Sequence, residues 1–383
     1  MRICYDARTI VDLQTGLGNY TFHILKYLLK IDTENNYTVL INHSLRKDHP
    51  VLKLGQKNLY KKFVRIPEVS FQQQYLIPLK LLQERPDIYH YPNFDLPVLQ
   101  PFNSVFTVHD LTYMKHKHLY YKGRWLKNYY TERIMRAGVK KAKKIIACSQ
   151  NTKRDLVEMF KVSANKVVVI YHALDEEFLN GANNYEENLS HLSIQKKVNG
   201  QQYFLFIGQL RPHKNIVRII KSFAKFKEKI PNGFKLIIGG NSYLNYKEPE
   251  KTVAEFGLTK DVCFLGYVEE NEIISLYRNA ACFVFPSLYE GFGIPILESM
   301  AVETPVITSN ISSMPEIAGE AAITVNPYSI DEIAAAMTAI VENKQLQQNL
   351  VEKGLKRVAE FSWQRAAEKT LKVYEETYKI RSN

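Results

Sequence analysis

Cysteine is scarce in this sequence, with four residues in 383 and no Cys-x-x-Cys pair. That number and spacing exclude a disulfide framework and a cysteine-based zinc cluster. Each cysteine stands beside apolar residues, so we expect small buried thiols in a reducing compartment. The four are Cys4, Cys148, Cys263 and Cys282.

Long hydrophobic runs are also lacking. No apolar stretch reaches the ~18–20 residues that span a bilayer, which argues against a transmembrane helix. The first ten residues, MRICYDARTI, hold no extended apolar segment of the kind found in a signal peptide. Because 45% of the residues are hydrophobic, the chain can still bury large cores, and we expect a cytoplasmic protein with more than one domain.

The second half of the chain has no excess of either charge, whereas the first half is strongly basic. Residues 1–180 hold 28 Lys and Arg against 16 Asp and Glu, and residues 181–383 hold 23 of each. The whole net charge of +12 therefore belongs to the first half. This asymmetry predicts an anionic partner there, which could be nucleic acid, an acidic membrane surface or a phosphorylated substrate.

Short apolar runs alternate with amphipathic stretches, which predicts strands alternating with helices. A polar stretch at 180–202, rich in Asn and Gln, separates two such series and is interpreted as a linker. Alternation of this kind gives right-handed βαβ units and mainly parallel sheets. The predicted strands are RICYDA, YTVLI, DIYHY, SVFTVHD, KKIIACS and KVVVIYH, followed by YFLFIG, KLIIGG, VCFLGY, ACFVFPS, TPVITS and AAITVN.

We therefore predict an α/β fold of two Rossmann-like, doubly wound domains that face each other across a cleft. The first domain is expected at residues 1–180 and the second at 181–363, with a last helix at about 364–383 that packs back on the first. Ligands of such sheets bind outside the carboxyl ends of the strands. The loops that follow the predicted strands are thus the places to search for a site.

The stretch LYEGFGIPILESMA follows an apolar strand and carries two carboxylates around a glycine turn. Pro295 suits the first turn of a helix, and the N–H groups of residues 291–293 with the helix dipole would form an anion site. Glu290 and Glu298 flank this site. Carboxylates beside a bound phosphate are electrostatically unfavourable unless they bind hydroxyl groups of the ligand. The pattern predicts a ligand that is both phosphorylated and rich in hydroxyls, such as a nucleotide sugar. The alternative is that both are solvated acids at the start of a helix.

The stretch GQLRPHKN follows the strand YFLFI and offers cations at the same edge of the second sheet. Gly208 permits a close turn, and Arg211 and Lys214 could neutralise a diphosphate leaving group. By itself this stretch would be interpreted as an ordinary basic loop. Its place at the same sheet edge as LYEGFGIPILESMA favours a role in binding the diphosphate.

Two weaker patterns occur in the first half. TVHD places His109 at the end of a strand, where an imidazole can orient a sugar hydroxyl, although a lone histidine is usually structural. DLQTGLGNY places Gly16 and Gly18 before a helix, as a second candidate approach for phosphate. The sequence has no Asp-x-Asp motif to clamp Mg²⁺, and His116 and His118 lack a third ligand, so we expect no metal site.

These residues resemble those of glycosyltransferase family 4, the retaining GT-B enzymes, over nearly the whole chain. The most specific likeness is the E-x7-E motif within PSLYEGFGIPILESMA. GQLRPHKNI is similar to the family's donor-phosphate loop, and VHDLTYMKH and ACSQNTKRDL are similar to its mannosyltransferase-like branch. The resemblance implies a GT-B fold and a nucleotide-sugar donor that is bound without a metal or another cofactor.

The resemblance also implies the roles of the candidate residues. The sugar and its phosphate contact His109, Glu290 and the backbone of 291–293, Glu298 binds the ribose hydroxyls, and Lys214 holds the diphosphate. The candidate catalytic residues are His109, Arg211, Lys214 and Glu290, and the candidate donor-binding residues are Gly16, Gly18, Gly208, Tyr267, Val268, Gly291, Phe292, Gly293 and Glu298.

One departure from the family concerns the diphosphate loop. Branch members often carry Arg directly before the loop lysine, and here that place holds His213. Arg211 could supply the charge from two residues earlier, so its role and that of other nearby cations stay open. Tyr267 and Val268 are expected beside the nucleobase.

The resemblance implies a metal-independent, retaining hexosyltransferase in which the acceptor attacks on the same face that the leaving phosphate departs from. Likeness to one branch suggests mannose from GDP-mannose, and a glycan or lipid-linked acceptor in cell-surface polysaccharide or glycolipid synthesis. The alternative is a nucleotide-sugar-binding or isomerising protein of the same architecture, which would need no acceptor. A nucleic-acid-binding module is a third hypothesis, but no recognised reader motif supports it and we expect no nucleic acid partner.

Residues 120–144, YYKGRWLKNYYTERIMRAGVKKAKK, interleave aromatic residues with cations. Such a stretch predicts an interfacial helix at the inner face of an anionic membrane. The alternative is a solvated helix that packs on the sheet through its aromatic residues.

Overall fold

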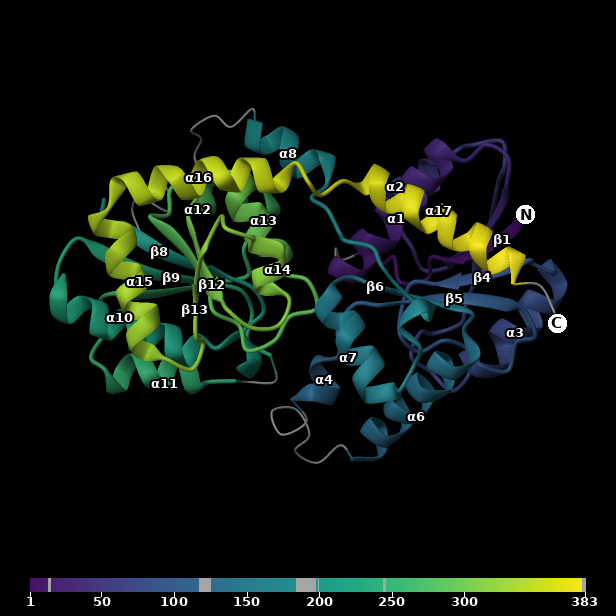
Figure 1. Cartoon of the computed structure of the whole chain (residues 1–383), viewed down its shortest axis with the longest axis horizontal. Coiled ribbons are helices and arrows are strands. Elements are labelled where there is room, and N and C mark those ends of the chain that lie inside the picture. The colour runs from purple at the N-terminus through teal and green to yellow at the C-terminus, as the bar shows by residue number, and fades with distance from the viewer. Residues whose placement is uncertain (13–14, 117–124, 184–197, 199, 244–245, 381–383) are drawn as a thin grey trace. The chain divides into compact units, whose positions relative to one another are not determined.

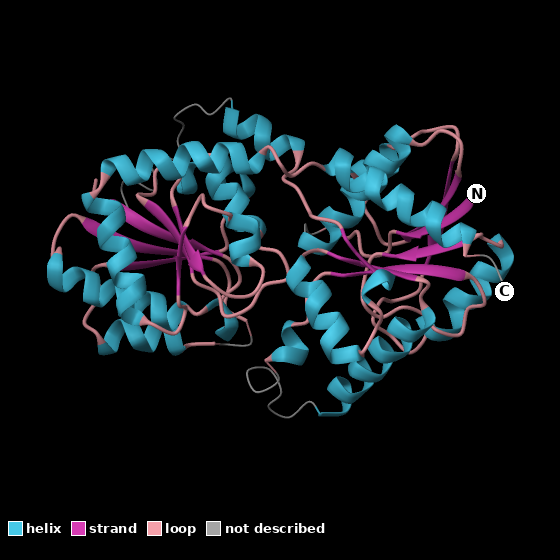
Figure 2. Cartoon of the chain, viewed as in Figure 1, coloured by secondary structure: helices cyan, strands magenta, loops and turns pink. Residues whose placement is uncertain are grey.

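The computed structural model of this chain describes residues 1–12, 15–116, 125–183, 198, 200–243 and 246–380. The chain divides into two units, Met1–His172 with Ser362–Asn383, and Ala173–Phe361, called unit 1 and unit 2 below. In each unit, helices cover both faces of a parallel sheet (Figure 2). Two doubly wound units confirm the predicted fold class. The assignment of one unit to the acceptor and the other to the donor stays a prediction.

The sheet of unit 1 has the strand order β3-β2-β1-β4-β5-β6-β7, and every described pairing in it is parallel. Its central strands are buried along nearly their whole length, as expected for a sheet covered on both faces. The strands are β1 (Arg2–Asp6), β2 (Asn36–Asn42), β3 (Leu59–Val64), β4 (Ile88–Tyr91), β5 (Asn103–Val108), β6 (Lys144–Ala147) and β7 (Val167–Val169).

Helices on the two faces of this sheet come from different parts of the chain. The last helix, α17, packs along α1 and against β4 and β5, whereas α3, α6 and α7 cover the opposite face (Figure 1). The helices are α1 (Gly16–Ile31), α2 (Pro50–Lys53), α3 (Gln73–Glu84), α4 (Thr112–Lys115), α6 (Trp125–Lys141), α7 (Gln150–Phe160) and α17 (Trp363–Lys379), with a 3₁₀ turn at Ala164–Lys166.

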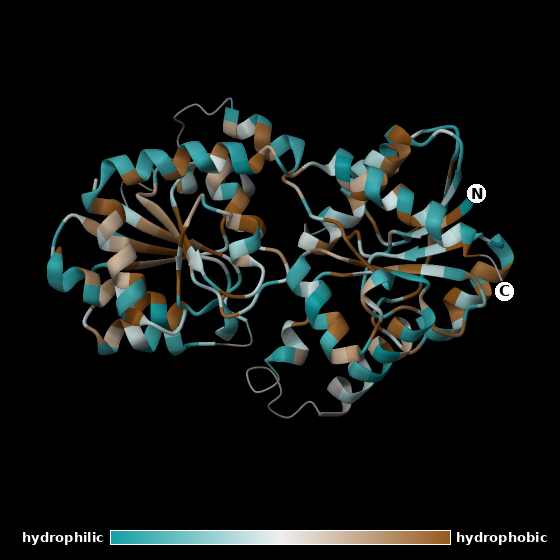
Figure 3. Cartoon of the chain, in the orientation of Figure 1, coloured by the Kyte–Doolittle hydropathy of each residue, from teal (hydrophilic) through white to brown (hydrophobic). Residues whose placement is uncertain are grey.

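The sheet of unit 2 has the order β10-β9-β8-β11-β12-β13 and is also parallel in every described pairing. The strands of this sheet are mainly hydrophobic (Figure 3). The strands are β8 (Gln202–Ile207), β9 (Phe234–Gly239), β10 (Val262–Gly266), β11 (Cys282–Phe285), β12 (Val306–Ser309) and β13 (Ile323–Val325).

In unit 2, α10 packs on α11 and α15, and α13 packs on α12, α14 and α16. Serine side chains cap two helices of the chain: Ser149 accepts from the Thr152 N–H at the start of α7 in unit 1, and Ser329 accepts from the Glu332 N–H at the start of α15. The helices are α8 (Glu176–Asn183), α10 (Ile216–Lys229), α11 (Glu248–Glu255), α12 (Glu270–Arg278), α13 (Ile294–Ala301), α14 (Met314–Ala318), α15 (Ile330–Glu342) and α16 (Lys344–Val358), with a 3₁₀ turn at Pro212–Lys214.

Two sequence interpretations need correction. The basic stretch 120–144 is not one helix: α6 ends at Lys141, and Lys144 begins β6, where its ammonium pairs with Glu376 at 2.8 Å. Residues 120–124 of that stretch lie outside the described residues. The predicted linker at 180–202 begins inside α8, and most of its remainder also lies outside the described residues.

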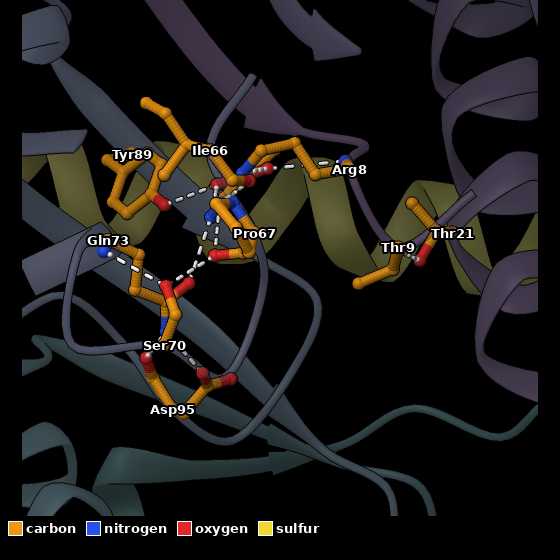
Figure 4. Close-up of polar contacts among 10 residues, drawn as sticks. Arg8, Thr9, Thr21, Ile66, Pro67, Ser70, Gln73, Tyr89 and Asp95 are labelled. Carbon is orange, nitrogen blue, oxygen red and sulfur yellow. Dashed lines mark hydrogen bonds and ion pairs between the residues drawn. The ribbon is translucent and has the colours of Figure 1, made fainter. Parts of the chain in front are cut away.

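A buried ion pair fastens the end of β1 to the start of α3. The Arg8 guanidinium donates to both carboxylate oxygens of Asp6 at 2.8 Å, and neither side chain is exposed. Its other N–H groups reach the Ile66 carbonyl at 3.0 Å and the Gln73 side chain at 3.2 Å, and Tyr89 donates to Asp6 (Figure 4). A buried charge is tolerated only when it is paired and hydrogen-bonded in this way. The network therefore holds α3 at a fixed rotation on the sheet.

Among the described residues, no helix has both the length and the apolar character needed to cross a bilayer.

Candidate active site

The loops after β8 and β11 lie at the point where the strand order of unit 2 reverses. β8 stands between β9 and β11, so the crossovers on its two sides run in opposite directions. Crevices at such points are the usual ligand sites of doubly wound sheets. The Leu288 N–H donates to the His213 carbonyl at 2.7 Å, which joins the two loops. The structure thus brings the motifs GQLRPHKN and LYEGFG together.

Two of the predicted catalytic residues form an ion pair at this junction. The Lys214 Nζ lies 2.6 Å from the Glu290 Oε1, and the two side chains are 16% and 13% exposed. The ammonium also lies 4.9 Å from the centre of the Phe285 ring, at the end of β11. A phosphate that enters here can replace Glu290 as the partner of Lys214. Glu290 can then accept from a hydroxyl group of the same ligand.

Asn215, which the sequence reasoning missed, fixes the end of the lysine loop. Its backbone is left-handed, with φ at 65°, and the side chain is 3% exposed. The amide Nδ2 lies 2.9 Å from the Pro286 carbonyl and 2.7 Å from the Pro327 carbonyl. Asn215 therefore ties the Lys214 loop to the strand end before Glu290. The sequence did hold a signal for this turn: an Asn directly follows the loop lysine, and Asn tolerates left-handed backbone better than most residues.

Two serines hold the turn that carries Glu290. The Ser312 hydroxyl accepts from the Glu290 N–H at 3.1 Å and lies 2.8 Å from its carbonyl. The Ser313 hydroxyl is fully buried, 2.9 Å from the Glu290 carbonyl and 2.8 Å from that of Phe292. Both serines act on the carbonyl side of residues 290–293, so they set the direction in which the turn presents its N–H groups. From the sequence alone, these two serines were given no role.

Glycine is required at two places around the site. Gly293 has φ at +108° and precedes α13, which has Pro295 in its first turn as predicted and no side-chain cap among the described contacts. Gly240, at φ +127°, passes so close to Gly208 that a Cβ there would lie 2.0 Å from the Gly208 carbonyl oxygen. The first shapes the start of the helix and the second lets the loop after β9 approach the loop after β8. Gly240 was not predicted.

Glu298 lies one turn into α13 and receives a hydrogen bond from a residue that the sequence did not indicate. The Tyr277 hydroxyl of α12 donates to the Glu298 Oε2 at 2.9 Å. Burial raises the pKa of the Glu298 carboxyl to about 7, against the opposing effect of the Tyr277 bond, and Asp175 raises it further. Near neutral pH this carboxyl is poised to ionise when a ligand brings hydroxyl donors to it.

The other predicted donor residues of unit 2 lie around these loops. The Arg211 guanidinium lies 4.2 Å from the centre of the Tyr243 ring and donates to the Gln209 side chain at 2.6 Å. After β10, Tyr267 is 57% exposed, whereas Val268 is buried and packs against the end of β9 at Gly239. An exposed ring beside a buried valine is suited to stacking on a nucleobase.

In unit 1 the structure places His109 directly after β5. Its Nε2 lies 3.0 Å from the Pro92 carbonyl, so Nε2 carries the proton and Nδ1 is the acceptor nitrogen. The Tyr20 ring packs edge-on against it at 4.6 Å, and the His172 ring lies at 5.3 Å. Burial lowers the pKa of His109, opposed by the Pro92 bond and by Asp110, so a neutral ring is offered to a hydroxyl donor.

The two candidate glycines of unit 1 lie at the start of α1. Gly16 is the first residue of the helix and has open space around its Cα. The Gly18 N–H donates to the Thr15 hydroxyl at 3.0 Å, and a Cβ there would lie 3.3 Å from the Thr9 carbonyl. Gly18 therefore has a packing reason in addition to the predicted contact with phosphate. Among the described residues, no group of three or more His, Cys, Asp or Glu side chains is arranged to hold a metal ion.

Comparison with known proteins finds relatives that match both halves of this chain. The family model described as Glycosyltransferase Family 4 matches residues 15–178, and the one described as Glycosyl transferases group 1 matches residues 190–357. The O-antigen chain mannosyltransferase B of Escherichia coli is 26% identical over 387 residues, which cover 98% of this chain and 99% of that protein. The O-antigen chain mannosyltransferase RfbU of Salmonella typhimurium is 32% identical over 253 residues, 66% of this chain and 63% of that protein.

Among solved structures, Anabaena HepE in complex with UDP and glucose is similar over 98% of this chain and all of that one. The TM-score is 0.74 and the identity 16%. At that identity the likeness shows the fold, and it agrees with the two Rossmann-like units described above.

Proposed function

Because the chain belongs to glycosyltransferase family 4, we propose that it moves a hexose from a nucleoside-diphosphate sugar to a glycan or lipid-linked acceptor in cell-surface polysaccharide or glycolipid synthesis. The observation that carries this proposal is the Lys214–Glu290 pair at the switch point of unit 2, beside the start of α13. A cation, a carboxylate and a helix N-terminus together suit a ligand with a diphosphate and many hydroxyls. The O-antigen mannosyltransferases support mannose from GDP-mannose as the donor.

We assign the residues as follows. Lys214, Arg211 and the start of α13 stabilise the charge that develops on the departing diphosphate. Glu290 and His109 orient hydroxyls of the sugar, and Glu298 accepts from the ribose. The bond from the sugar C1 to phosphate oxygen breaks, the bond from C1 to the acceptor oxygen forms on the same face, and the acceptor proton passes to the departing phosphate.

A donor panel tests the proposal. Purified protein is given each of several UDP and GDP hexoses, with and without lipid-linked glycan acceptors, and release of the nucleoside diphosphate is measured. We expect release from GDP-mannose that depends on an acceptor, with the new linkage retaining the donor's anomeric configuration. Conversion of the nucleotide sugar without any acceptor would favour the alternative, an isomerising or binding protein of the same fold.

The assignment of Glu298 gives a separate prediction. Glu298→Ala should weaken binding of the nucleoside diphosphate by roughly 1–3 kcal/mol, the range for hydrogen bonds to a charged group. Because burial raises the pKa of Glu298 to about 7 and ribose hydroxyls favour its ionised form, wild-type affinity should also rise between pH 6 and pH 8. Titration calorimetry of the nucleotide at several pH values measures both effects.

Glu298→Gln is the matched control, because it keeps the shape and the Tyr277 contact but does not titrate. The difference in affinity between wild type and this variant should grow with pH, which separates the carboxyl from the titration of the nucleotide itself. Both variants should fold. The pKa of Glu298 is raised in the folded protein, so its carboxyl lowers the free energy of unfolding as pH rises from about 4.5 to about 7, and replacing it removes that cost at neutral pH. Wild-type affinity in Glu298→Ala would refute the ribose assignment.

A further inference from the structure

The helix α3 of unit 1 carries large apolar side chains on its exposed side as well as on its buried side, which is unusual for a helix on a protein surface. One side is buried against the sheet through Gln73, Gln74, Ile77, Pro78 and Leu81. The opposite side and the preceding turn expose five large apolar side chains, each between 41% and 66% exposed. These five, called the α3 face, are Phe71, Tyr75, Leu76, Leu79 and Leu82.

The α3 face carries no exposed carboxylate. The other exposed residues of 71–85 are Gln72, Gln83 and Arg85. The only acid of this segment, Glu84, is partly covered and lies 3.3 Å from Lys80 and 3.6 Å from Lys62 of β3. An apolar patch with a cationic border is typical of a surface that binds a partner rather than water.

The helix α6 contributes a second exposed stripe, which is basic. Tyr129, Arg133, Arg136 and Lys140 are exposed at the spacing of one helix face, and we call them the α6 stripe. The Arg133 guanidinium lies 4.9 Å from the centre of the Tyr129 ring, and Arg136 pairs with Glu132, the one acid of α6, at 2.8 Å. The stripe therefore presents an aromatic ring followed by three cations.

The two surfaces belong together. Both helices cover the same face of the unit 1 sheet (Figure 1). The helix cannot rotate to bury these apolar side chains, because the buried side chain of Gln73 is held by hydrogen bonds to Arg8 and Asp95 (Figure 4). The α3 face is thus fixed outward on the side of the sheet that also carries the α6 stripe.

We propose that the α3 face inserts its apolar side chains into the surface of an anionic phospholipid membrane while the α6 stripe binds the lipid phosphates. The charges favour this occupant over a second copy of the chain, because pairing the face with itself about a two-fold axis would bring two cationic stripes together. The inference deepens the proposed function, on which it rests, by naming the surface that would bring the enzyme to a lipid-linked acceptor. Its test does not require transfer activity.

The full-length protein is sedimented with vesicles of phosphatidylcholine, with and without phosphatidylglycerol, at low and high salt. We expect binding to the anionic vesicles that weakens as salt is raised. Leu79→Gln with Leu82→Gln should lower partitioning roughly tenfold or more at either salt concentration, because it removes inserting side chains. Arg133→Gln, Arg136→Gln and Lys140→Gln together should lower it by about 10- to 100-fold at low salt and little at high salt.

Matched controls come from exposed residues of unit 2. Leu355→Gln removes an apolar side chain of 44% exposure, and Lys260→Gln, Lys344→Gln and Lys356→Gln together remove three exposed cations. Both controls should partition like wild type. All altered residues are exposed, so the variants should melt like wild type and bind the nucleoside diphosphate with unchanged affinity.

Three results would overturn the proposal. One is failure of the wild-type protein to bind anionic vesicles at low salt, and another is unchanged partitioning of both sets of unit 1 variants. The third is a concentration-dependent dimer, seen by light scattering, that is lost in Leu79→Gln with Leu82→Gln, which would show a second copy on the α3 face. Vesicle binding without donor release in the panel would instead refute the proposed function and leave the membrane surface standing.

Discussion

Lys214→Ala should lower kcat/KM by about 10²–10³, as expected when one preorganised electrostatic contact to a leaving group is removed. In the resting protein the Lys214 ammonium lies 2.6 Å from the Glu290 carboxylate, in a partly desolvated place at the switch point of unit 2. A charge held there needs little reorganisation when the diphosphate departs. The effect should appear mainly in kcat, because the negative charge on the diphosphate grows toward the transition state.

The chain offers a matched control for this variant. Lys227 and Asp261 form another ion pair of unit 2, at 2.7 Å and with side chains 15% and 27% exposed. Lys227→Ala should lower the free energy of unfolding by a similar amount to Lys214→Ala and should leave the transfer rate unchanged. Equal losses of activity in Lys214→Ala and Lys227→Ala would show that the first acts only through the fold.

The same assignment predicts little effect of a chelator. Lys214, Arg211 and the start of α13 are proposed to supply the positive charge, so excess EDTA should leave the rate within about twofold of its value without chelator. The assay is the nucleoside diphosphate release used for the donor panel. Loss of activity in EDTA that Mg²⁺ restores would mean that a metal ion stabilises the leaving group.

Most of the fold could be predicted from the sequence because buried parallel strands are short apolar runs with clear ends. The strand β3 was missed, since it lies at the sheet edge and reads LYKKFV, with two lysines and an exposed Phe63. The helix α3 was missed because it contains Pro78 and because apolar residues lie on both its buried and its exposed side, so no amphipathic period is visible. In both cases tertiary position, not local pattern, decides the structure.

The candidate site was predictable where function depends on loops next to strand ends. Glu290 and Lys214 are 76 residues apart, yet each lies in the loop that follows a predicted strand, and the parallel sheet brings those loops together. The supporting residues were not predictable in the same way. Tyr277 reads as a core tyrosine of α12, and only the packing of α12 on α13 shows that its hydroxyl meets Glu298.

Acidification should destabilise unit 1 and not unit 2. His90 is fully buried, with its two ring nitrogens 2.6 Å from the Tyr374 hydroxyl and 3.1 Å from that of Thr107, and burial lowers its pKa to about 3. Burial also lowers the pKa of His172 well below its usual value, and nearby His109 lowers it further. Below the unfolded-chain pKa of about 6.5, only the unfolded state takes up these protons, so the free energy of unfolding falls as pH falls.

The size of the effect follows from about 1.4 kcal/mol per pH unit for each such histidine. Glu68 of unit 1 acts in the opposite direction, because burial raises its pKa to about 7. We therefore expect unit 1 to lose on the order of 1–2 kcal/mol between pH 7 and pH 5. Unit 2 should be stabilised over the same window, because the pKa of Glu298 is raised to about 7 and its protonation relieves the cost of a buried charge.

Tryptophan fluorescence separates the two units, because both tryptophans of the chain, Trp125 and Trp363, belong to unit 1. Thermal melts followed by this signal should shift to lower temperature as pH falls from 7 to 5, whereas the remaining calorimetric transition should not. His90→Gln should reduce the pH dependence of the fluorescence transition, and His43→Gln, at an exposed histidine of the same unit, should leave it unchanged. A fluorescence midpoint that stays constant between pH 7 and pH 5 would contradict neutral, buried histidines at the core of unit 1.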